Sequence, residues 1–299
     1  MSDRPNGLLV PITTPFDAAT GDVAPVTLRE NARGMLAAGV AGIVAAGSTG
    51  EAAMLGEDEY RRVVGWLRDV VDDGRWLVAG AGRESTRAAI AACHAAAEEG
   101  ADAVLVRPPS YYSSSITPRG LLTHFRRIAD ESPVPVLLYN IPKYTHLSLS
   151  DALLSGLHGH QNVWGVKDSS GDLKNFGAYR DAAPSWSMFM GSGALYYAAL
   201  ELGAAGAVAA VGCFAARPVV AIGEWFDLGD KQRAGAMQEV VAPLHSGIVL
   251  ALGVPGVKAA MDAVGLGGGP LREPLQALGD RDRGRVAKLL VTAGLIQHA

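Results

Sequence analysis

The sequence predicts an α/β protein, a (β/α)8 TIM barrel with a C-terminal helical extension. Short apolar runs alternate with amphipathic segments, and eight such pairs follow one another along the chain. This alternation is typical of parallel strands connected by helices. An open, doubly wound sheet is the rival architecture, but no glycine-rich dinucleotide fingerprint is present, and its absence favours the barrel.

The eight expected strands are short and mostly apolar throughout. Strands of this kind are buried on both faces, as in a barrel covered by helices. The expected strands cover residues 8–16, 42–49, 76–82, 103–109, 135–140, 163–169, 187–193 and 206–214.

Capping signals mark the start of several of the intervening helices. Thr27 with Glu30, and Ser148 with Asp151, have the spacing of a capping box. The Thr-Pro step at 117–118 predicts an N-cap followed by proline at the first helical position.

The chain beyond the last expected strand reads as helix. Apolar residues recur at helical spacing in four segments, with a glycine- and proline-containing loop at 265–275 among them. We therefore expect a catalytic barrel over residues 1–222 and a C-terminal helical region over 223–299. The four segments are 218–229, 231–252, 256–265 and 281–297.

The composition excludes several classes of function. A net charge of −4 and a pI near 6.0 argue against nucleic-acid binding and anionic membrane surfaces. We find no long apolar run free of glycine-rich interruption, and so expect no membrane span. The apolar stretch near the start is short and proline-broken, so we expect no signal peptide. Cys93 and Cys213 give no disulfide framework and suit the cytoplasm.

One lysine lies inside an apolar run, in the stretch VWGVKDSSGDL at 163–173. Read as a strand, this run places Lys167 at its carboxyl end, which is where barrels of this type carry their functional residues. A buried, unpaired lysine tends to lose its proton, and a neutral amine is a nucleophile. The alternatives are an ion pair with Asp168 and a side chain whose ammonium group reaches water. Neighbouring residues on a strand point to opposite faces, which weakens the first of these.

Other strand ends carry polar groups. Tyr139 ends the preceding strand and is either a proton shuttle or a core aromatic. Ser48 and Thr49, in GSTGE, are either anion-binding residues or part of an ordinary turn. The MGSG segment at 190–193 is either a phosphate grip or a site of close packing. The HGH segment at 158–160 precedes its strand, on the opposite face, and we expect no metal site there.

These motifs together resemble one known superfamily. GSTGE, SYY, LYNIP, GVKDSSGDL and GVPGVKAAMD…GGPLREPL occur in the order found in the dihydrodipicolinate synthase and N-acetylneuraminate lyase superfamily, over nearly the whole chain. That superfamily consists of (β/α)8 barrels, usually homotetramers, which form a Schiff base between a lysine and pyruvate or another 2-oxo acid. The segments AGAGREST, ADESPVPVLLYNIP and KDSSGD look most like its 4-hydroxy-2-oxoglutarate aldolase branch.

The resemblance assigns roles residue by residue. It implies that Lys167 forms the Schiff base, that Tyr139 is the acid/base tyrosine and that Ser48 is a hydroxyl of the proton relay. It implies that the backbone of Thr49 helps to bind the carboxylate of the 2-oxo acid. Tyr112 matches the tyrosine that reaches across a subunit interface to complete the relay.

The resemblance also bears on the surroundings of the lysine. Val208, on the last strand, matches an apolar residue near it. The covalent Schiff base needs no cofactor and no metal. The expected partners are a small-molecule 2-oxo acid and further copies of the chain, in a homotetramer.

Two departures from the superfamily pattern concern the substrate. Dihydrodipicolinate synthases carry an arginine that grips a carboxylate where this chain has Tyr144, preceded by Lys143. Sialic acid lyases carry acidic residues where this chain has Gly193 and Ala194. The first absence weakens the synthase reading, and the second leaves a sugar polyol few partners.

The sequence therefore predicts a class I aldolase that cleaves a short 4-hydroxy-2-oxo acid. Within the enzyme class, one alternative is a 4-hydroxy-tetrahydrodipicolinate synthase in which Arg107 or Lys143 grips the carboxylate. Another is dehydration of a deoxy sugar acid. The alternative from a different class is a non-catalytic barrel that binds a 2-oxo acid or a phosphate.

Overall fold

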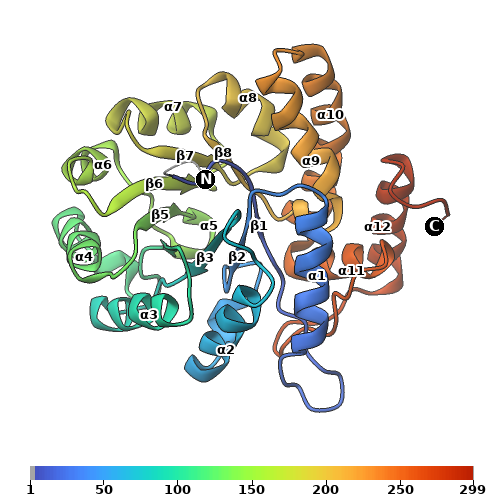
Figure 1. Cartoon of the computed structure of the whole chain (residues 1–299), viewed down its shortest axis with the longest axis horizontal. Coiled ribbons are helices and arrows are strands. Elements are labelled where there is room, and N and C mark those ends of the chain that lie inside the picture. The colour runs from blue at the N-terminus through green and yellow to red at the C-terminus, as the bar shows by residue number, and fades with distance from the viewer. Residues whose placement is uncertain (1–3, 299) are drawn as a thin grey trace.

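Eight parallel strands close into a barrel (Figure 1). The computed structural model describes residues 4–298. Each strand pairs with its neighbours in the sequence, and β8 closes the barrel by pairing with β1. This confirms the predicted fold. The strands are β1 (Gly7–Pro11), β2 (Gly42–Ala45), β3 (Trp76–Gly80), β4 (Ala103–Val106), β5 (Val136–Asn140), β6 (Val163–Asp168), β7 (Ser187–Met190) and β8 (Gly206–Val208).

The strands are shorter than the apolar runs that predicted them. The clearest case is the run at 206–214, because β8 ends at Val208 and the next helix begins at Gly212. The residues after β8 are still buried, since they pack where the chain turns from the barrel into that helix. An apolar run indicates that its residues are buried. Because burial continues past the end of the strand, the run overestimates the length of the strand.

Helices surround the barrel (Figure 1). Three short 3₁₀ turns lie in loops that follow strands β2, β4 and β7. The helices up to β8 are α1 (Pro25–Ala37), α2 (Glu57–Arg68), α3 (Thr86–Glu98), α4 (Pro118–Glu131), α5 (Pro142–Thr145), α6 (Asp151–Leu157), α7 (Leu173–Ala182) and α8 (Tyr196–Glu201). The 3₁₀ turns are η1 (Ala52–Met54), η2 (Ser113–Ser115) and η3 (Gly193–Leu195).

One of the three predicted helix caps is present. Thr117 caps α4 by accepting a hydrogen bond from Gly120 N–H at 3.1 Å, and proline follows it. The cap at Thr27 is wrong, because the proline that opens α1 starts that helix before Thr27. The cap at Ser148 is also wrong, because Ser150 accepts from the N–H of Leu153 and starts α6 there.

The C-terminal helices pack beside the barrel (right of Figure 1), as predicted. They are α9 (Gly212–Asp227), α10 (Lys231–Leu244), the π-helix η4 (His245–Leu250), α11 (Ala251–Ala263) and α12 (Asp280–Thr292). The division at residues 222 and 223 falls inside α9, and the separation into two domains stays a prediction.

One run in this region bears on the expectation that the chain has no membrane span, which stays a prediction. Residues Lys231–Ala263, which join α10, η4 and α11, form a helix long and apolar enough to cross a membrane by length and composition. The run is interrupted by π-helical turns and by a non-helical Gly253. Its helices pack against α9 and α12, so this one run is weak evidence for a membrane segment.

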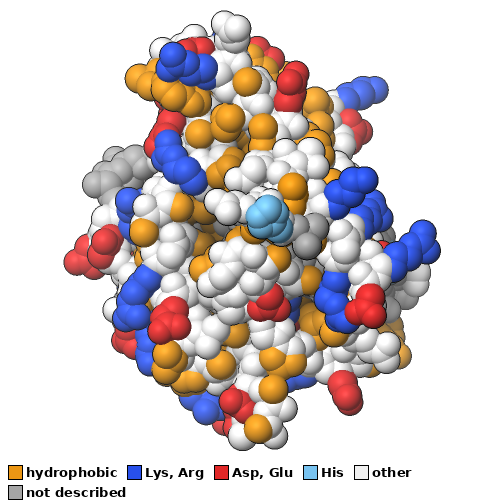
Figure 2. Space-filling view, turned by 90° about the vertical axis from the view of Figure 1, so that its right-hand side faces the viewer, with side chains coloured by type: hydrophobic (Ala, Val, Ile, Leu, Met, Phe, Trp, Pro, Cys, Tyr) orange, Lys and Arg blue, Asp and Glu red, His pale blue; other side chains and the backbone are white. Residues whose placement is uncertain are grey.

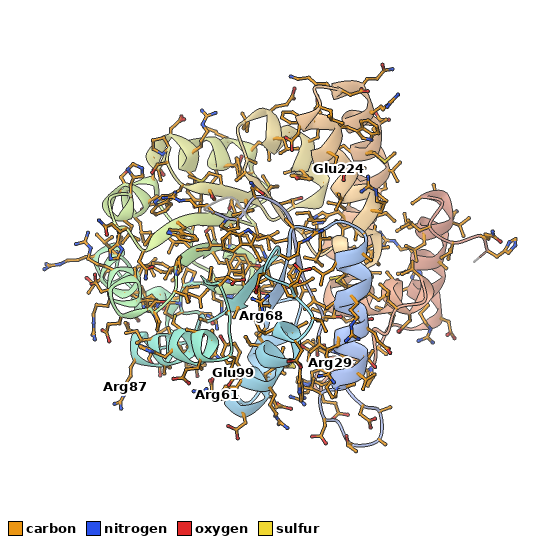
Figure 3. The ribbon with its side chains drawn as sticks, viewed as in Figure 1. Arg29, Arg61, Arg68, Arg87, Glu99 and Glu224 are labelled. Atoms are coloured by element: carbon orange, nitrogen blue, oxygen red, sulfur yellow. The ribbon has the colours of Figure 1, made fainter. Side chains whose placement is uncertain are left out.

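Acidic and basic side chains form ion pairs between the helices around the barrel. Arg61 of α2 lies 3.4 Å from Glu99 at the end of α3 (Figure 3). It also pairs with Glu98, at 2.8 Å. Such exposed pairs add little to stability. On the face that carries the C-terminal helices, acidic and basic side chains are interspersed (Figure 2).

The core has two layers, and the alternation of side chains along each strand assigns residues to them. One layer lies between the strands and the helices. The other fills the barrel and includes Tyr139, Phe189 and Val208. Lys167 is paired in register with both Tyr139 and Phe189. Residues opposite one another in a sheet point to the same face, so Lys167 points into the barrel.

Candidate functional site

A cavity of about 450 Å³ lies at the carboxyl ends of the strands. The side chains that line it come from β5, β6 and the loops after β2 and β7, and from the C-terminal helices. It brings together seven of the nine residues selected from the sequence: Lys167, Tyr139, Ser48, Thr49, Val208, Lys143 and Tyr144.

Lys167 and Tyr139 are the buried polar pair of this cavity. They are opposite one another in the β5–β6 register, and their exposed fractions are 5% and 6%. Lys167 Nζ lies 4.0 Å from the centre of the Tyr139 ring. No carboxylate forms an ion pair with Lys167 within residues 4–298. The structure thus holds an amine at the mouth of an apolar barrel.

Asp168 is not the partner of Lys167. Its carboxylate points to the opposite face of β6, where it accepts hydrogen bonds from Asn140 Nδ2 and Ser170 Oγ, both at 2.7 Å. Asn140 Oδ1 in turn accepts from the N–H of Leu149. These buried bonds join the ends of β5 and β6, and so fix the relative positions of the two strands that carry Tyr139 and Lys167.

The GSTGE loop brings Ser48 and Thr49 to the cavity. Its conformation is fixed at its end, where Glu51 has a left-handed backbone with φ of 54°. Glu51 Oε1 lies 2.6 Å from Lys258 Nζ, and both side chains are buried. Arg272 N–H donates to Glu51 Oε2 at 3.0 Å. The sequence reading missed this link because Lys258 and Arg272 lie more than two hundred residues away from Glu51.

Arg107 lies outside this cavity. It lines a second one, of about 640 Å³, which shares Ser48, Tyr139, Lys143 and Tyr144 with the first. The Arg107 guanidinium pairs with Glu84 at 3.0 Å and also donates to the carbonyl of Pro108. The structure therefore commits Arg107 to a neighbouring carboxylate, which the sequence position alone did not reveal.

Glu84 is a loop anchor. Its carboxylate accepts hydrogen bonds from the backbone N–H groups of Ser110 and Tyr111, each at 2.9 Å, as well as from Arg107. Partial burial alone would raise the pKa of Glu84, but these backbone and side-chain bonds outweigh it and lower the pKa to about 2. The anchored loop leads into Tyr112.

Tyr112 is 69% exposed and lines neither cavity. Its ring packs edge to face on that of Tyr111, which is 80% exposed, with ring centres 4.9 Å apart. Two adjacent exposed tyrosines are unusual on a solvated surface and enriched at protein interfaces. Within one chain, Tyr112 does not reach Ser48 or Tyr139.

Lys143 and Tyr144 form the rim shared by the two cavities. Both are exposed, and Lys143 Nζ lies 5.6 Å from the centre of the Tyr144 ring. Partial burial raises the pKa of Tyr144, and the nearby Tyr139 adds to this. The rim thus offers one amine and one neutral phenol.

The cavity also contains polar residues that the sequence reading did not select. Ser192, after β7, and His245, in η4, both line it and lie within hydrogen-bonding distance of each other. The serine lies in the MGSG segment, but the histidine lies within a segment expected to be plain helix. The HGH histidines instead bond Ser185 and Asp130. Within residues 4–298 there is no cluster of three potential metal ligands.

Comparisons with known proteins agree with this architecture. The profile of the dihydrodipicolinate synthetase family matches residues 4–293. The chain is 37% identical to an uncharacterized DapA-like lyase of Halobacterium salinarum over 291 residues, 97% of this chain and 95% of that protein. It is also 37% identical, over 81% of each chain, to a probable mitochondrial 4-hydroxy-2-oxoglutarate aldolase of Emericella nidulans.

A solved structure shares the whole fold. It is the chloride-inhibited dihydrodipicolinate synthase of Acinetobacter baumannii, determined as a complex with pyruvate. It superimposes with a TM-score of 0.92 at 30% identity and covers 97% of this chain and 99% of its own. A (β/α)8 barrel with a lysine at the top of β6, matched over almost its full length by these relatives, belongs to the dihydrodipicolinate synthetase family. The protein is accordingly a lyase of that family.

Proposed function

We propose that the protein is a class I aldolase in which Lys167 forms a Schiff base with pyruvate or a related 2-oxo acid. The observation that carries the proposal is the geometry of Lys167, a buried amine without a carboxylate partner, against the ring of Tyr139. Family membership supports the same chemistry. A barrel that only binds a 2-oxo acid would not need a hydroxyl relay beside the amine.

The reaction begins with attack of the neutral Lys167 amine on the substrate ketone. Water leaves as the iminium forms, and Tyr139 moves the protons. In the cleavage direction, the iminium accepts the electron pair of the C3–C4 bond, the 4-hydroxyl loses its proton, and an aldehyde departs. A pyruvate enamine remains, is protonated at C3, and is hydrolysed to pyruvate and the free amine.

The remaining site residues bind the substrate or transfer protons to it. Ser48 passes a proton between Tyr139 and Tyr112, the latter from a neighbouring subunit. Thr49 binds the carboxylate of the 2-oxo acid through its backbone, and Val208 provides an apolar wall beside the lysine. The exposed tyrosine pair on each chain supports a homo-oligomer, which we propose to be a tetramer.

The same chemistry bears on the cofactor, the compartment and the partners of the enzyme. The Schiff base requires no metal and no cofactor, since the iminium itself is the electron sink. We propose a cytoplasmic enzyme that acts on small molecules, with neither nucleic acid nor membrane as a partner. The mixed surface charges and the net charge of −4 support this setting.

For the substrate we propose a short 4-hydroxy-2-oxo acid of the 4-hydroxy-2-oxoglutarate type. Tyr144 stands where the synthases hold a carboxylate with arginine, and Arg107 is committed to Glu84. A charged pair missing from a desolvated carboxylate costs several kcal/mol, roughly 2–5. Of the two cations considered for holding this carboxylate, Lys143 lines the Lys167 cavity at its rim, and Arg107 does not.

The alternative is 4-hydroxy-tetrahydrodipicolinate synthase, which the structural likeness to a dihydrodipicolinate synthase keeps open. The test is a side-by-side measurement of kcat/KM for cleavage of 4-hydroxy-2-oxoglutarate and for condensation of pyruvate with aspartate semialdehyde. We expect cleavage to be faster by about thirtyfold or more, which corresponds to the lower end of that energy range. Condensation faster by tenfold would replace the aldolase with the synthase.

A further inference from the structure

Two polar side chains in the Lys167 cavity have no part in the chemistry proposed above. Ser192 follows β7, and His245 is the first residue of the π-helix η4. His245 Nε2 lies 3.2 Å from Ser192 Oγ, and the N–H of Gly193 donates to His245 Nδ1 at 3.2 Å. Short π-helical segments are rare and frequently occur at functional sites.

The hydrogen bonds determine the direction in which the serine donates. His245 Nδ1 accepts from a backbone N–H and therefore carries no proton, so the imidazole proton is on Nε2. Nε2–H donates to Ser192 Oγ, which leaves the serine's own proton free to donate into the cavity. Burial lowers the pKa of His245 to about 4, so the ring is neutral near pH 7 and this arrangement persists.

The segment that carries Ser192 is held rigidly. Gln238 of α10 donates from Nε2 to the carbonyl of Gly193 at 2.9 Å, so both backbone groups of Gly193 are bonded to the C-terminal helices. A Cβ atom at position 193 would lie 2.5 Å from Cγ1 of Val211, so only glycine allows this close packing. The hydroxyl is thus preorganised before any ligand arrives.

We propose that Ser192, oriented by His245, binds the carboxylate at the far end of the substrate. The inference rests on the proposed function, because it assumes that the ketone carbon of the substrate is bound to Lys167. A carboxylate only accepts hydrogen bonds, which matches a hydroxyl whose proton is directed into the cavity. The substrate class is then a short 2-oxo dicarboxylic acid. His245 acts through the serine and is a positioning residue.

The experiment measures Schiff-base formation without turnover. Borohydride trapping on the full-length protein is titrated with 2-oxoglutarate, which has a distal carboxylate, and with 2-oxobutyrate, which lacks that carboxylate and ends in a methyl group one carbon earlier. We expect the wild type to reach half-maximal trapping at a lower concentration of 2-oxoglutarate. Ser192→Ala should weaken this preference by about 10- to 100-fold, as for a lost bond to a charged group. The half-maximal concentration of 2-oxobutyrate should stay unchanged.

Two further variants separate orientation from loop rigidity. His245→Phe keeps a ring in place but removes both of its hydrogen bonds, and it should reduce the preference in the same direction as Ser192→Ala. Gln238→Ala removes the other bond to the Gly193 backbone from outside the cavity. It should shift both acids together and leave their ratio near that of the wild type.

The possible failures are distinguishable. A wild type that traps 2-oxobutyrate on Lys167 but does not prefer 2-oxoglutarate overturns the subsite and leaves the Schiff-base chemistry standing. A preference that survives Ser192→Ala but disappears in Lys143→Met places the carboxylate at the rim, and also overturns the subsite. A wild type that traps pyruvate but neither of these acids overturns the subsite alone, and one that traps none of the three overturns the subsite and the proposed function together.

Discussion

Lys167 Nζ lies 4.0 Å from the centre of the Tyr139 ring, and the two residues are directly opposite one another in the register of β5 and β6. One residue further along each strand, Asn140 and Asp168 are opposite in the same register and share a buried hydrogen bond of 2.7 Å. The first pair points into the barrel and the second points outward. The outward pair aligns the strand ends that carry the inward one.

The covalent role of Lys167 is directly testable. We expect sodium borohydride with pyruvate to add mass to the intact chain, and peptide mapping to place the addition on Lys167. Lys167→Ala should form no adduct. Lys143→Met is the matched control, because Lys143 is the other amine that lines the cavity, and it should be trapped like the wild type. An undiminished adduct in Lys167→Ala would refute the assignment.

The Tyr139 hydroxyl is expected to matter more than its ring. Tyr139→Phe keeps the contact with Lys167 and removes only the proton carrier. We expect turnover to fall by roughly 10²–10⁴-fold, the usual range for a general acid–base group. Tyr144→Phe removes a hydroxyl from the same cavity and should have a much smaller effect. Equal losses in both variants would show that Tyr139 has no special role.

Removing one partner of the buried Glu51–Lys258 ion pair should lower the free energy of unfolding. Glu51→Gln leaves an ammonium group without its carboxylate in the interior, and the loss of one partner of a buried pair costs about 3–5 kcal/mol of unfolding free energy. The double variant Glu51→Gln/Lys258→Met removes both charges and should recover part of this loss. Denaturant unfolding of the wild type and both variants measures these differences. A double variant less stable than Glu51→Gln would contradict this account.

Lys167 and Tyr139 could be placed from the sequence because the strand period and the strand ends are local properties. An apolar run sets the position of a strand, and alternation along it decides which side chains point inward. The chemical roles of the two residues came from the resemblance to the superfamily, since most lysines at strand ends form ion pairs or extend their ammonium group into water.

His245 and Lys258 could not be placed in this way. Ser192 and His245 are 53 residues apart in the sequence, and only the packing of the C-terminal helices on the barrel brings them together. The pairing of Arg107 was missed for a related reason, because Glu84 arrives from a different loop and occupies its guanidinium. Partners of this kind depend on tertiary contacts, which no local pattern reports.

Tyr112 is expected to act in a neighbouring subunit, because it is exposed and lies outside both cavities of its own chain. Tyr112→Phe and Lys167→Ala should each be poorly active alone. Mixed oligomers of the two should regain activity, since an intact Lys167 in one chain then meets an intact Tyr112 from the other. Mixing Tyr139→Phe with Lys167→Ala is the control and should recover nothing. Failure of the first mixture in confirmed hetero-oligomers would remove Tyr112 from the relay.

The anchoring of the tyrosine loop should depend on acid pH. The pKa of Glu84 falls from an ordinary value of 4.5 to about 2 in the folded protein. A carboxyl group with a lowered folded pKa stabilises the fold fully above its unfolded pKa, and the contribution is lost as pH falls toward the folded pKa. The wild type should therefore exceed Glu84→Gln in unfolding free energy near neutral pH, and this advantage should shrink between about pH 5 and pH 2.

The comparison is made by denaturant unfolding of both proteins across that pH range. Because Glu84 is partly exposed, solvent screening makes the difference in unfolding free energy between the two proteins small. The test is therefore whether this difference changes with pH. Glu131→Gln is a suitable control, since Glu131 is exposed and pairs with Arg127, one turn earlier in α4. Its difference from the wild type should change little over the same range. A Glu84→Gln difference that stays constant with pH would show that the carboxylate does not hold the loop through its charge.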